Sequence, residues 1–111
     1  MSVSTIFRTQ WAGYAQVHAN RLNFAVHLVT VPVFMAGTVA VIWGLCVWSA
    51  ATSIAGVLAM MAALAAQGWG HRRESVPSAP FSGPVDAIAR LLLEQWVTFP
   101  SYVLRRVLRA G

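Results

Sequence analysis

Three histidines and one glutamate are the residues of this chain whose types and positions could bind a metal ion. His71 and Glu74 stand three residues apart, a spacing at which two side chains of a helix can meet one ion. His18 and His27 occur earlier in the chain. Imidazoles with a carboxylate suit Fe(II), Zn(II) or Cu(II), and two histidines, one carboxylate and open positions are typical of non-haem Fe(II) oxygen chemistry. We therefore predict a metal site that could hold Fe(II), Zn(II) or Cu(II).

A polar residue precedes each histidine by four positions. Residues four apart share one face of a helix, so each partner would lie beside its histidine. These three candidate catalytic residues are Tyr14, Asn23 and Gln67. Arg72 and Arg73 follow the last histidine and are candidates for binding an acidic substrate. Glu94 is an additional candidate site residue.

The composition indicates an integral membrane protein of one domain, residues 1–111. Of its 111 residues, 58% are hydrophobic and 10% are charged. A soluble domain has about 25% charged residues, so this chain has too little polar surface to cover a water-soluble globule. All eight basic residues are arginines that flank apolar segments, which fits anionic lipid headgroups better than nucleic acid.

Two apolar segments are long enough to cross a bilayer, at about residues 22–48 and 50–70. Pro32 lies inside the first segment and is expected to kink it, which membrane helices tolerate. Only a short turn separates the segments, so they predict an antiparallel hairpin. Small residues recur at every fourth position and would let the helices of the hairpin, or of a homo-oligomer, approach closely. They are Ala36, Ala40 and Gly44 in the first segment and Ala51, Ala55, Ala59 and Ala63 in the second.

The flanking segments predict further helices, so the expected fold class is all-α. Residues 4–18 have an amphipathic pattern that is typical of a helix in the membrane interface, and Asn20 is a suitable N-cap for the next helix. Residues 75–84 contain three prolines and are expected to form a loop. Residues 84–109 predict a C-terminal helix that is interfacial rather than spanning, and Pro100 should break or bend it.

The arginines predict the topology, because every one lies outside the hairpin. By the positive-inside rule, both termini are expected in the cytoplasm, and the expected location is the inner membrane of a bacterium. Polar residues interrupt residues 8–23, which argues against a signal peptide. Cys46 stands alone in an apolar segment, so it excludes an intrachain disulfide and is expected to be a small buried residue.

The hairpin brings the histidines to one depth, because the start of the first span and the end of the second lie at the same boundary. A simpler interpretation exists for each histidine taken by itself, since a single histidine near headgroups is more often a titrating surface residue. Glu74 could likewise pair with Arg72 or Arg73. We favour a shared site because His18, His27 and His71 are all expected at this boundary.

A resemblance to a known family rests on two motifs, Tyr14-x3-His18-x4-Asn23-x3-His27-x4-Pro32 and Gln67-x2-Gly70-His71-x2-Glu74-x2-Pro77. These residues resemble the family of the fungal 2-hydroxy-palmitic acid dioxygenase, which consists of small membrane proteins. The motifs run from residue 14 to residue 77, more than half of the chain. Family members often have glycine at two positions where this chain has Thr30 and Arg72.

The resemblance implies an Fe(II)-dependent, membrane-embedded dioxygenase of fatty-acid α-oxidation, which shortens a 2-hydroxy fatty acid by one carbon. His18, His27 and His71 match the family's histidines, and Glu74 matches its downstream acid. The expected partners are the membrane and a lipid or fatty-acid substrate, whose carboxylate Arg72 or Arg73 would neutralise. The alternative is a non-catalytic small membrane protein whose histidines serve packing, metal binding or a partner subunit.

Overall fold

The computed structural model describes residues 2–110. In that range helices are the only regular secondary structure, and turns and loops connect them. This confirms the all-α fold class. The elements are α1 (Val3–Val17), α2 (Arg21–Cys46), α3 (Ala50–His71), α4 (Pro84–Leu93), a π-helical turn η1 (Glu94–Thr98) and α5 (Phe99–Ala110).

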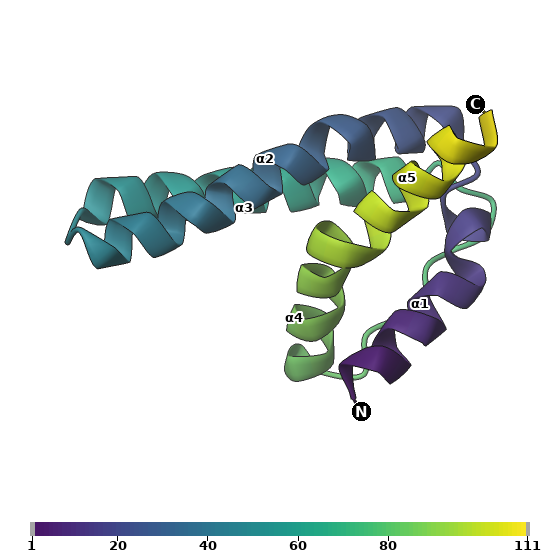
Figure 1. Cartoon of the computed structure of the whole chain (residues 1–111), viewed down its shortest axis with the longest axis horizontal. Coiled ribbons are helices and arrows are strands. Elements are labelled where there is room, and N and C mark those ends of the chain that lie inside the picture. Colours follow the sequence, from purple (N-terminus) through teal and green to yellow (C-terminus); the bar gives the residue numbers. More distant parts are fainter. Residues whose placement is uncertain (1, 111) are drawn as a thin grey trace.

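Helices α2 and α3 run antiparallel, side by side, and form the long axis of the molecule (Figure 1). They contain 26 and 22 residues, so they are about 39 and 33 Å long at 1.5 Å per residue. Both are long and apolar enough to cross a membrane, and only 22% and 17% of their most apolar windows are buried inside the chain. The core helix of a soluble protein would be mostly buried, so the exposed apolar surface favours a lipid environment.

The connection between α2 and α3 is short. The Ser49 amide donates to the Gly44 carbonyl over 2.8 Å, and the Ser49 hydroxyl then accepts from the Thr52 amide to cap α3. Trp48 lies in the connection between α2 and α3, has a φ of 58° and is 95% exposed. A left-handed tryptophan costs about 1 kcal/mol relative to glycine, and an exposed tryptophan at a hairpin tip suits the membrane–water interface.

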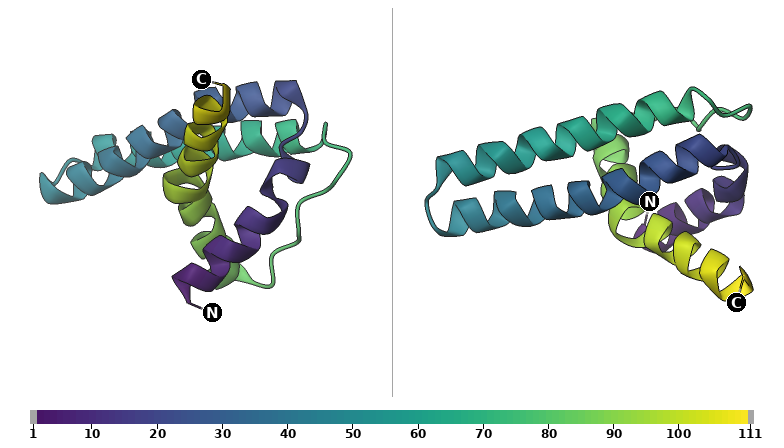
Figure 2. Two further views of the ribbon diagram at one scale, coloured as in Figure 1. Left: turned by 45° about the vertical axis from the view of Figure 1, so that its right-hand side comes forward. Right: turned by 90° about the horizontal axis from the view of Figure 1, so that it is seen from above.

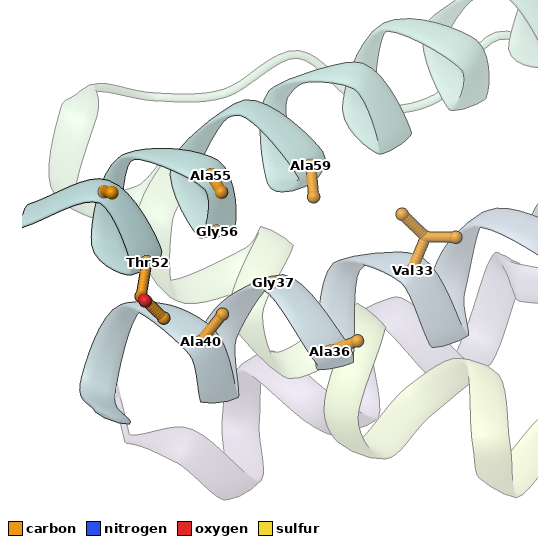
Figure 3. Close-up of a pocket in the computed structure, with 9 residues that line it drawn as sticks. Val33, Ala36, Gly37, Ala40, Thr52, Ala55, Gly56 and Ala59 are labelled. Carbon is orange, nitrogen blue, oxygen red and sulfur yellow. The ribbon is translucent and has the colours of Figure 1, made fainter. Parts of the chain in front are cut away.

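Glycines bring the two long helices into contact. A Cβ atom on Gly37 would lie 2.7 Å from the Gly56 carbonyl oxygen, and one on Gly56 would lie 2.5 Å from the Gly37 carbonyl oxygen. The predicted rows of small residues did not include these two glycines. Gly44 of the predicted rows does lie at the contact, since its Cβ atom would be 2.6 Å from the Ser53 amide nitrogen, whereas Ala36 and Ala40 line, together with Gly37 and Gly56, an open groove of about 550 Å³ along the hairpin (Figure 3).

The remaining helices gather at the open end of the hairpin. Helix α4 runs crosswise to α2 and α3, and α1 and α5 lie near the same end, so that the closed tip projects beyond them (Figures 1 and 2). Asn20 caps α2 as predicted, because its side-chain oxygen accepts from the Asn23 amide. Gly83 precedes α4 and Pro84 is its first residue.

The C-terminal helical segment changes its hydrogen bonding just before Pro100. The Phe99 amide donates to the Glu94 carbonyl, a spacing of five residues that defines the π-helical turn. Proline has no amide hydrogen to donate, so the regular pattern of bonds cannot continue through Pro100. The sequence predicted a break or bend at this residue, and the π-helical turn is the form that the irregularity takes.

Polar side chains make up much of the interior, beside a small apolar cluster of Tyr14, Val31 and Phe99. The largest fully buried side chains are His18, His27, Gln95, Asn23 and Thr98. Many large apolar side chains of α2 and α3 are exposed instead. Cys46 is also exposed, so the expectation that it is buried was wrong. Because buried polar groups are costly unless they are paired, this cluster of buried polar side chains is the candidate functional site.

Candidate metal centre

Four side chains from four different segments converge at the open end of the hairpin. His18 follows α1, His27 lies in the second turn of α2, His71 ends α3, and Glu94 begins η1. One nitrogen or oxygen atom of each side chain lies within 4.8 Å of the corresponding atoms of the other three. Ligand atoms bound at about 2.1 Å stand roughly 3 to 4 Å apart, so a small contraction would close this group around one ion. The group could therefore hold a metal ion.

The three imidazole rings have a threefold arrangement. The ring centroids are 4.7 Å apart for His18 and His27, 4.7 Å for His18 and His71, and 4.8 Å for His27 and His71. The corresponding angles between ring planes are 81°, 80° and 81°. Three nearly perpendicular rings at equal distances can direct one nitrogen each toward a common centre without stacking on one another.

Backbone carbonyls fix the tautomer of two histidines. His18 Nδ1 lies 2.9 Å from the Tyr14 carbonyl oxygen, and His27 Nδ1 lies 2.9 Å from the Asn23 carbonyl oxygen. Because a carbonyl oxygen can only accept, each Nδ1 carries the hydrogen, and each Nε2 presents a lone pair to the centre. Metal-binding histidines are commonly held in this way.

Those two Nε2 atoms are buried and have no hydrogen-bond partner among the described residues. His18 Nε2 instead faces Glu94 Oε2 at 3.3 Å, and His27 Nε2 lies 4.0 Å from the same oxygen. A lone pair that faces a carboxylate is repelled unless a proton or a metal cation lies between them. A buried polar atom without a partner costs about 1–3 kcal/mol, and a bound cation would remove this cost for both nitrogens.

The Glu94 carboxylate is held in the site by Tyr14. The tyrosine hydroxyl donates to Glu94 Oε2 over 2.9 Å. Burial raises the pKa of Tyr14, and the charge of Glu94 raises it further, so the hydroxyl stays protonated and remains a donor. Burial raises the pKa of Glu94, whereas positive charge on His18 and His27, when these are protonated, and the hydrogen bond from Tyr14 lower it, and the net direction is below the ordinary value.

No protein-family model, curated protein or solved structure matches this chain. What the site does must therefore be argued from its own residues. The resemblance based on the two histidine motifs stays a prediction.

Glu74, the carboxylate that the sequence placed in the metal site, lies outside this group of four. Its oxygens accept from the Asn20 amide at 2.9 and 3.1 Å and from Asn23 Nδ2 at 2.7 Å. Glu74 thus fastens the chain after α3 to the turn between α1 and α2. Because Glu74 links the segments that carry His18, His27 and His71, it helps to keep these three side chains close together.

The other predicted residues surround the site without facing the centre. Asn23 is completely buried against Gly70, and a Cβ atom on that glycine would clash with the Asn23 side-chain oxygen. Gln67 exchanges two hydrogen bonds with Gln95, of 2.9 and 2.7 Å, and also donates to the Thr30 hydroxyl. Asn23 and Gln67 therefore lie around the group of four and are not part of it.

The two arginines after His71 differ in their surroundings. The Arg73 guanidinium lies over the Trp69 ring, 4.4 Å from its centroid. The side chain of Arg72 is exposed and makes no hydrogen bond, ion pair or ring contact with the other described residues. Of the two, Arg72 is therefore the one whose guanidinium is available to an acidic ligand near His71.

Gln10 is a positioning residue that the sequence did not reveal. Its Nε2 donates to the Arg90 carbonyl over 2.8 Å, and its Oε1 accepts from the Thr98 hydroxyl at 2.6 Å. These two contacts lie on either side of Glu94, so Gln10 clamps the π-helical turn from α1. No helical spacing connects residue 10 with residues 90 and 98, and only the folded arrangement shows the clamp.

We expect Gln10→Leu to weaken metal binding roughly tenfold, because loss of outer hydrogen bonds around a site typically costs 10–100-fold in metal affinity. The affinity should be measured by metal titration of the purified protein. Gln16→Leu, at an exposed position of the same helix, is the matched control and should leave the affinity unchanged. Equal affinities for the two variants would show that the clamp does not position Glu94.

Proposed function

We propose that this chain is a metal-dependent membrane enzyme that uses Fe(II), held by His18, His27, His71 and Glu94, to oxidise a 2-hydroxy fatty acid. The observation that supports a metal most strongly is the pair of buried Nε2 atoms, of His18 and His27, that face the Glu94 carboxylate and have no hydrogen-bond partner among the described residues. Three imidazoles with one carboxylate suit Fe(II), and they also suit Zn or Cu. The choice of iron and of substrate follows the resemblance in the histidine motifs.

An iron ion in this site would supply O2 activation and a template for the substrate. The protein residues divide the other tasks between them. His18 and His27 are fully buried, whereas His71 and Glu94 are partly exposed, so a substrate approaches from the side of these two residues. Tyr14 holds its proton at Glu94 Oε2 and keeps that carboxylate oriented.

The location of the site suits an amphiphilic acid. The histidines lie at the open end of the hairpin, where the chain also carries Arg72 and Arg73, and the apolar surfaces of α2 and α3 extend away from it. A carboxylate head could reach the site from the headgroup region while its acyl chain stays in hydrocarbon. The 2-hydroxyl would give the head a second oxygen for the ion, and Arg72 would neutralise the carboxylate.

The proposed topology places both termini in the cytoplasm. It rests on the eight arginines, all outside the hairpin, and on the absence of any arginine in the connection around Trp48. A reporter fused after the last residue should be active on the cytoplasmic side in cells. Reporter activity restricted to the other side of the membrane would contradict this orientation.

The function is tested with iron-loaded protein in detergent and a long-chain 2-hydroxy fatty acid. We expect O2 consumption and formation of the acid that is one carbon shorter, with little turnover of the same acid without the hydroxyl group. His27→Ala is the control that should abolish both signals, because it removes one ligand. Equal turnover of the two acids would refute chelation through the 2-hydroxyl, and an iron-containing protein that consumes no O2 would refute the reaction. Purified protein without metal would favour a non-catalytic membrane protein.

A further inference from the structure

Helix α5 exposes apolar and basic side chains together. Leu104, Val107 and Leu108 are 60%, 61% and 69% exposed. Their spacing of three and four residues places them on one face of the helix. Arg105, Arg106 and Arg109 are also exposed, beside that face. A basic amphipathic helix of this kind is typical of segments that lie in the surface of an anionic bilayer.

The positive charge of α5 has no carboxylate partner among the described residues. The chain contains only three acidic side chains. Asp86 pairs with Arg90 at 3.4 Å, Glu74 accepts hydrogen bonds from Asn20 and Asn23, and Glu94 faces the histidines. Since all three carboxylates are engaged elsewhere, the anions that balance α5 must come from outside this part of the chain.

Two of the arginines are already oriented by aromatic rings of neighbouring helices. The Arg105 guanidinium lies 5.3 Å from the centroid of the Trp11 ring, and that of Arg106 lies 4.1 Å from the centroid of the Phe24 ring. A guanidinium that rests on a ring keeps the N–H groups at its edge free for hydrogen bonds. An anion that binds Arg105 therefore meets a side chain whose position is partly fixed in advance.

An open hollow lies beside Arg105, lined by Arg105, Leu108 and Arg109 and with a volume of about 270 Å³. Two arginines one helical turn apart can donate to the same phosphate, since guanidinium groups match phosphate geometry. Leu108 in the wall provides apolar surface next to the two charges. A free phosphate ion would use the arginines alone, whereas a phospholipid would use both kinds of surface.

We propose that this hollow binds the headgroup of an anionic phospholipid, with its acyl chains along Leu104, Val107 and Leu108. The lipid partner is a component of the bilayer and is distinct from the substrate of the metal site. It would fix α5 at the membrane surface and thereby support the aromatic contacts that α5 makes with α1 and α2.

The test uses the purified full chain in an uncharged detergent and tail-labelled phosphatidylglycerol, whose binding is followed by fluorescence anisotropy. Phosphatidylglycerol should bind at least about tenfold more tightly than phosphatidylcholine with the same acyl chains, because each arginine near an anionic headgroup adds a favourable interaction. Arg109→Gln should lower this preference severalfold, and Arg105→Gln combined with Arg109→Gln should abolish it. Arg8→Gln, at an exposed position of α1, is the matched control and should leave it unchanged.

Arg105→Gln also removes the contact with Trp11, so Arg105→Lys serves as the variant that keeps the charge and should retain the preference. Metal content should be the same in all of these proteins, which separates this site from the metal centre. Equal binding of the two lipids, or an equal loss in Arg8→Gln and Arg109→Gln, would overturn the proposal. Displacement of phosphatidylglycerol by inorganic phosphate at equal concentration would overturn it in favour of a free-phosphate site.

Discussion

Glu94→Gln is expected to remove most of the bound metal from the purified protein. Glutamine has almost the same size as glutamate but carries no charge, so the variant keeps the hydrogen bond with Tyr14 and loses the anionic ligand. Loss of outer hydrogen bonds alone typically costs 10–100-fold in metal affinity, so loss of a direct ligand should cost more than about 100-fold. Metal titration gives the affinity, and elemental analysis gives the metal content per chain.

Glu74→Gln is the matched control, because it makes the same chemical change at the other partly buried carboxylate near the histidines. We expect this variant to keep one metal per chain and to be less stable. Glu74 accepts hydrogen bonds from an amide and from Asn23, and such bonds to a charged group contribute about 1.5–3 kcal/mol. If Glu74→Gln lost the metal and Glu94→Gln kept it, the ligand set that the sequence predicted would be correct and the set that the structure shows would be wrong.

Local signals in the sequence were sufficient to predict most of the helices. Asn20 caps α2 as predicted, because its side-chain oxygen accepts from the Asn23 amide, and Ser49 caps α3 in the same way although it was not among the predicted caps. Pro84 begins α4, a position at which its missing amide hydrogen costs nothing. The histidines were predicted to lie together because an antiparallel hairpin brings the start of one helix beside the end of the other. His18, His27 and His71 do converge in the structure.

The carboxylate of the site could not be assigned from spacing. The prediction that His71 and Glu74 meet one ion required a helix through both residues, but α3 ends at His71. After that point the chain turns, and the Glu74 amide donates to the His71 carbonyl over 3.1 Å, while the Glu74 side chain points to Asn20 and Asn23. Glu94 follows twenty residues later, beyond a loop that contains Pro77 and Pro80 and beyond helix α4. Its approach depends on the tertiary packing of η1, which no periodic pattern records.

The packing of α2 against α3 could likewise be predicted only in part from the sequence. The sequence contained several rows of small residues, and the choice among them depends on how each helix is rotated about its axis. In the structure Gly37 meets Gly56, and Gly44 of the predicted row meets Ser53, whereas Ala36, Ala40, Ala55 and Ala59 line the open groove beside this contact (Figure 3). The same rotation lets Gln67 reach Thr30 and Gln95 at the open end, where His27 and His71 face the same centre.

This arrangement predicts opposite effects for two glycine-to-alanine changes in α3. In Gly56→Ala the new methyl group would lie 2.5 Å from the Gly37 carbonyl oxygen and 2.8 Å from the Val41 amide nitrogen. Both are backbone atoms that cannot rotate away, so α2 and α3 must separate. Overpacking of this kind costs about 1–3 kcal/mol of the free energy of unfolding.

In Gly68→Ala the new methyl group would meet nothing within 4 Å, so the change should stabilise α3 by up to about 1 kcal/mol through the higher helix propensity of alanine. The two variants differ only in position along one helix, which makes each the control for the other. Thermal unfolding in detergent should therefore give a lower midpoint for Gly56→Ala than for the unaltered chain and an equal or higher one for Gly68→Ala. A midpoint for Gly56→Ala that matched or exceeded that of Gly68→Ala would mean that α2 and α3 do not meet at Gly37 and Gly56. His27 and His71 lie on these two helices, so a different contact between the helices would also turn the two histidines away from their common centre.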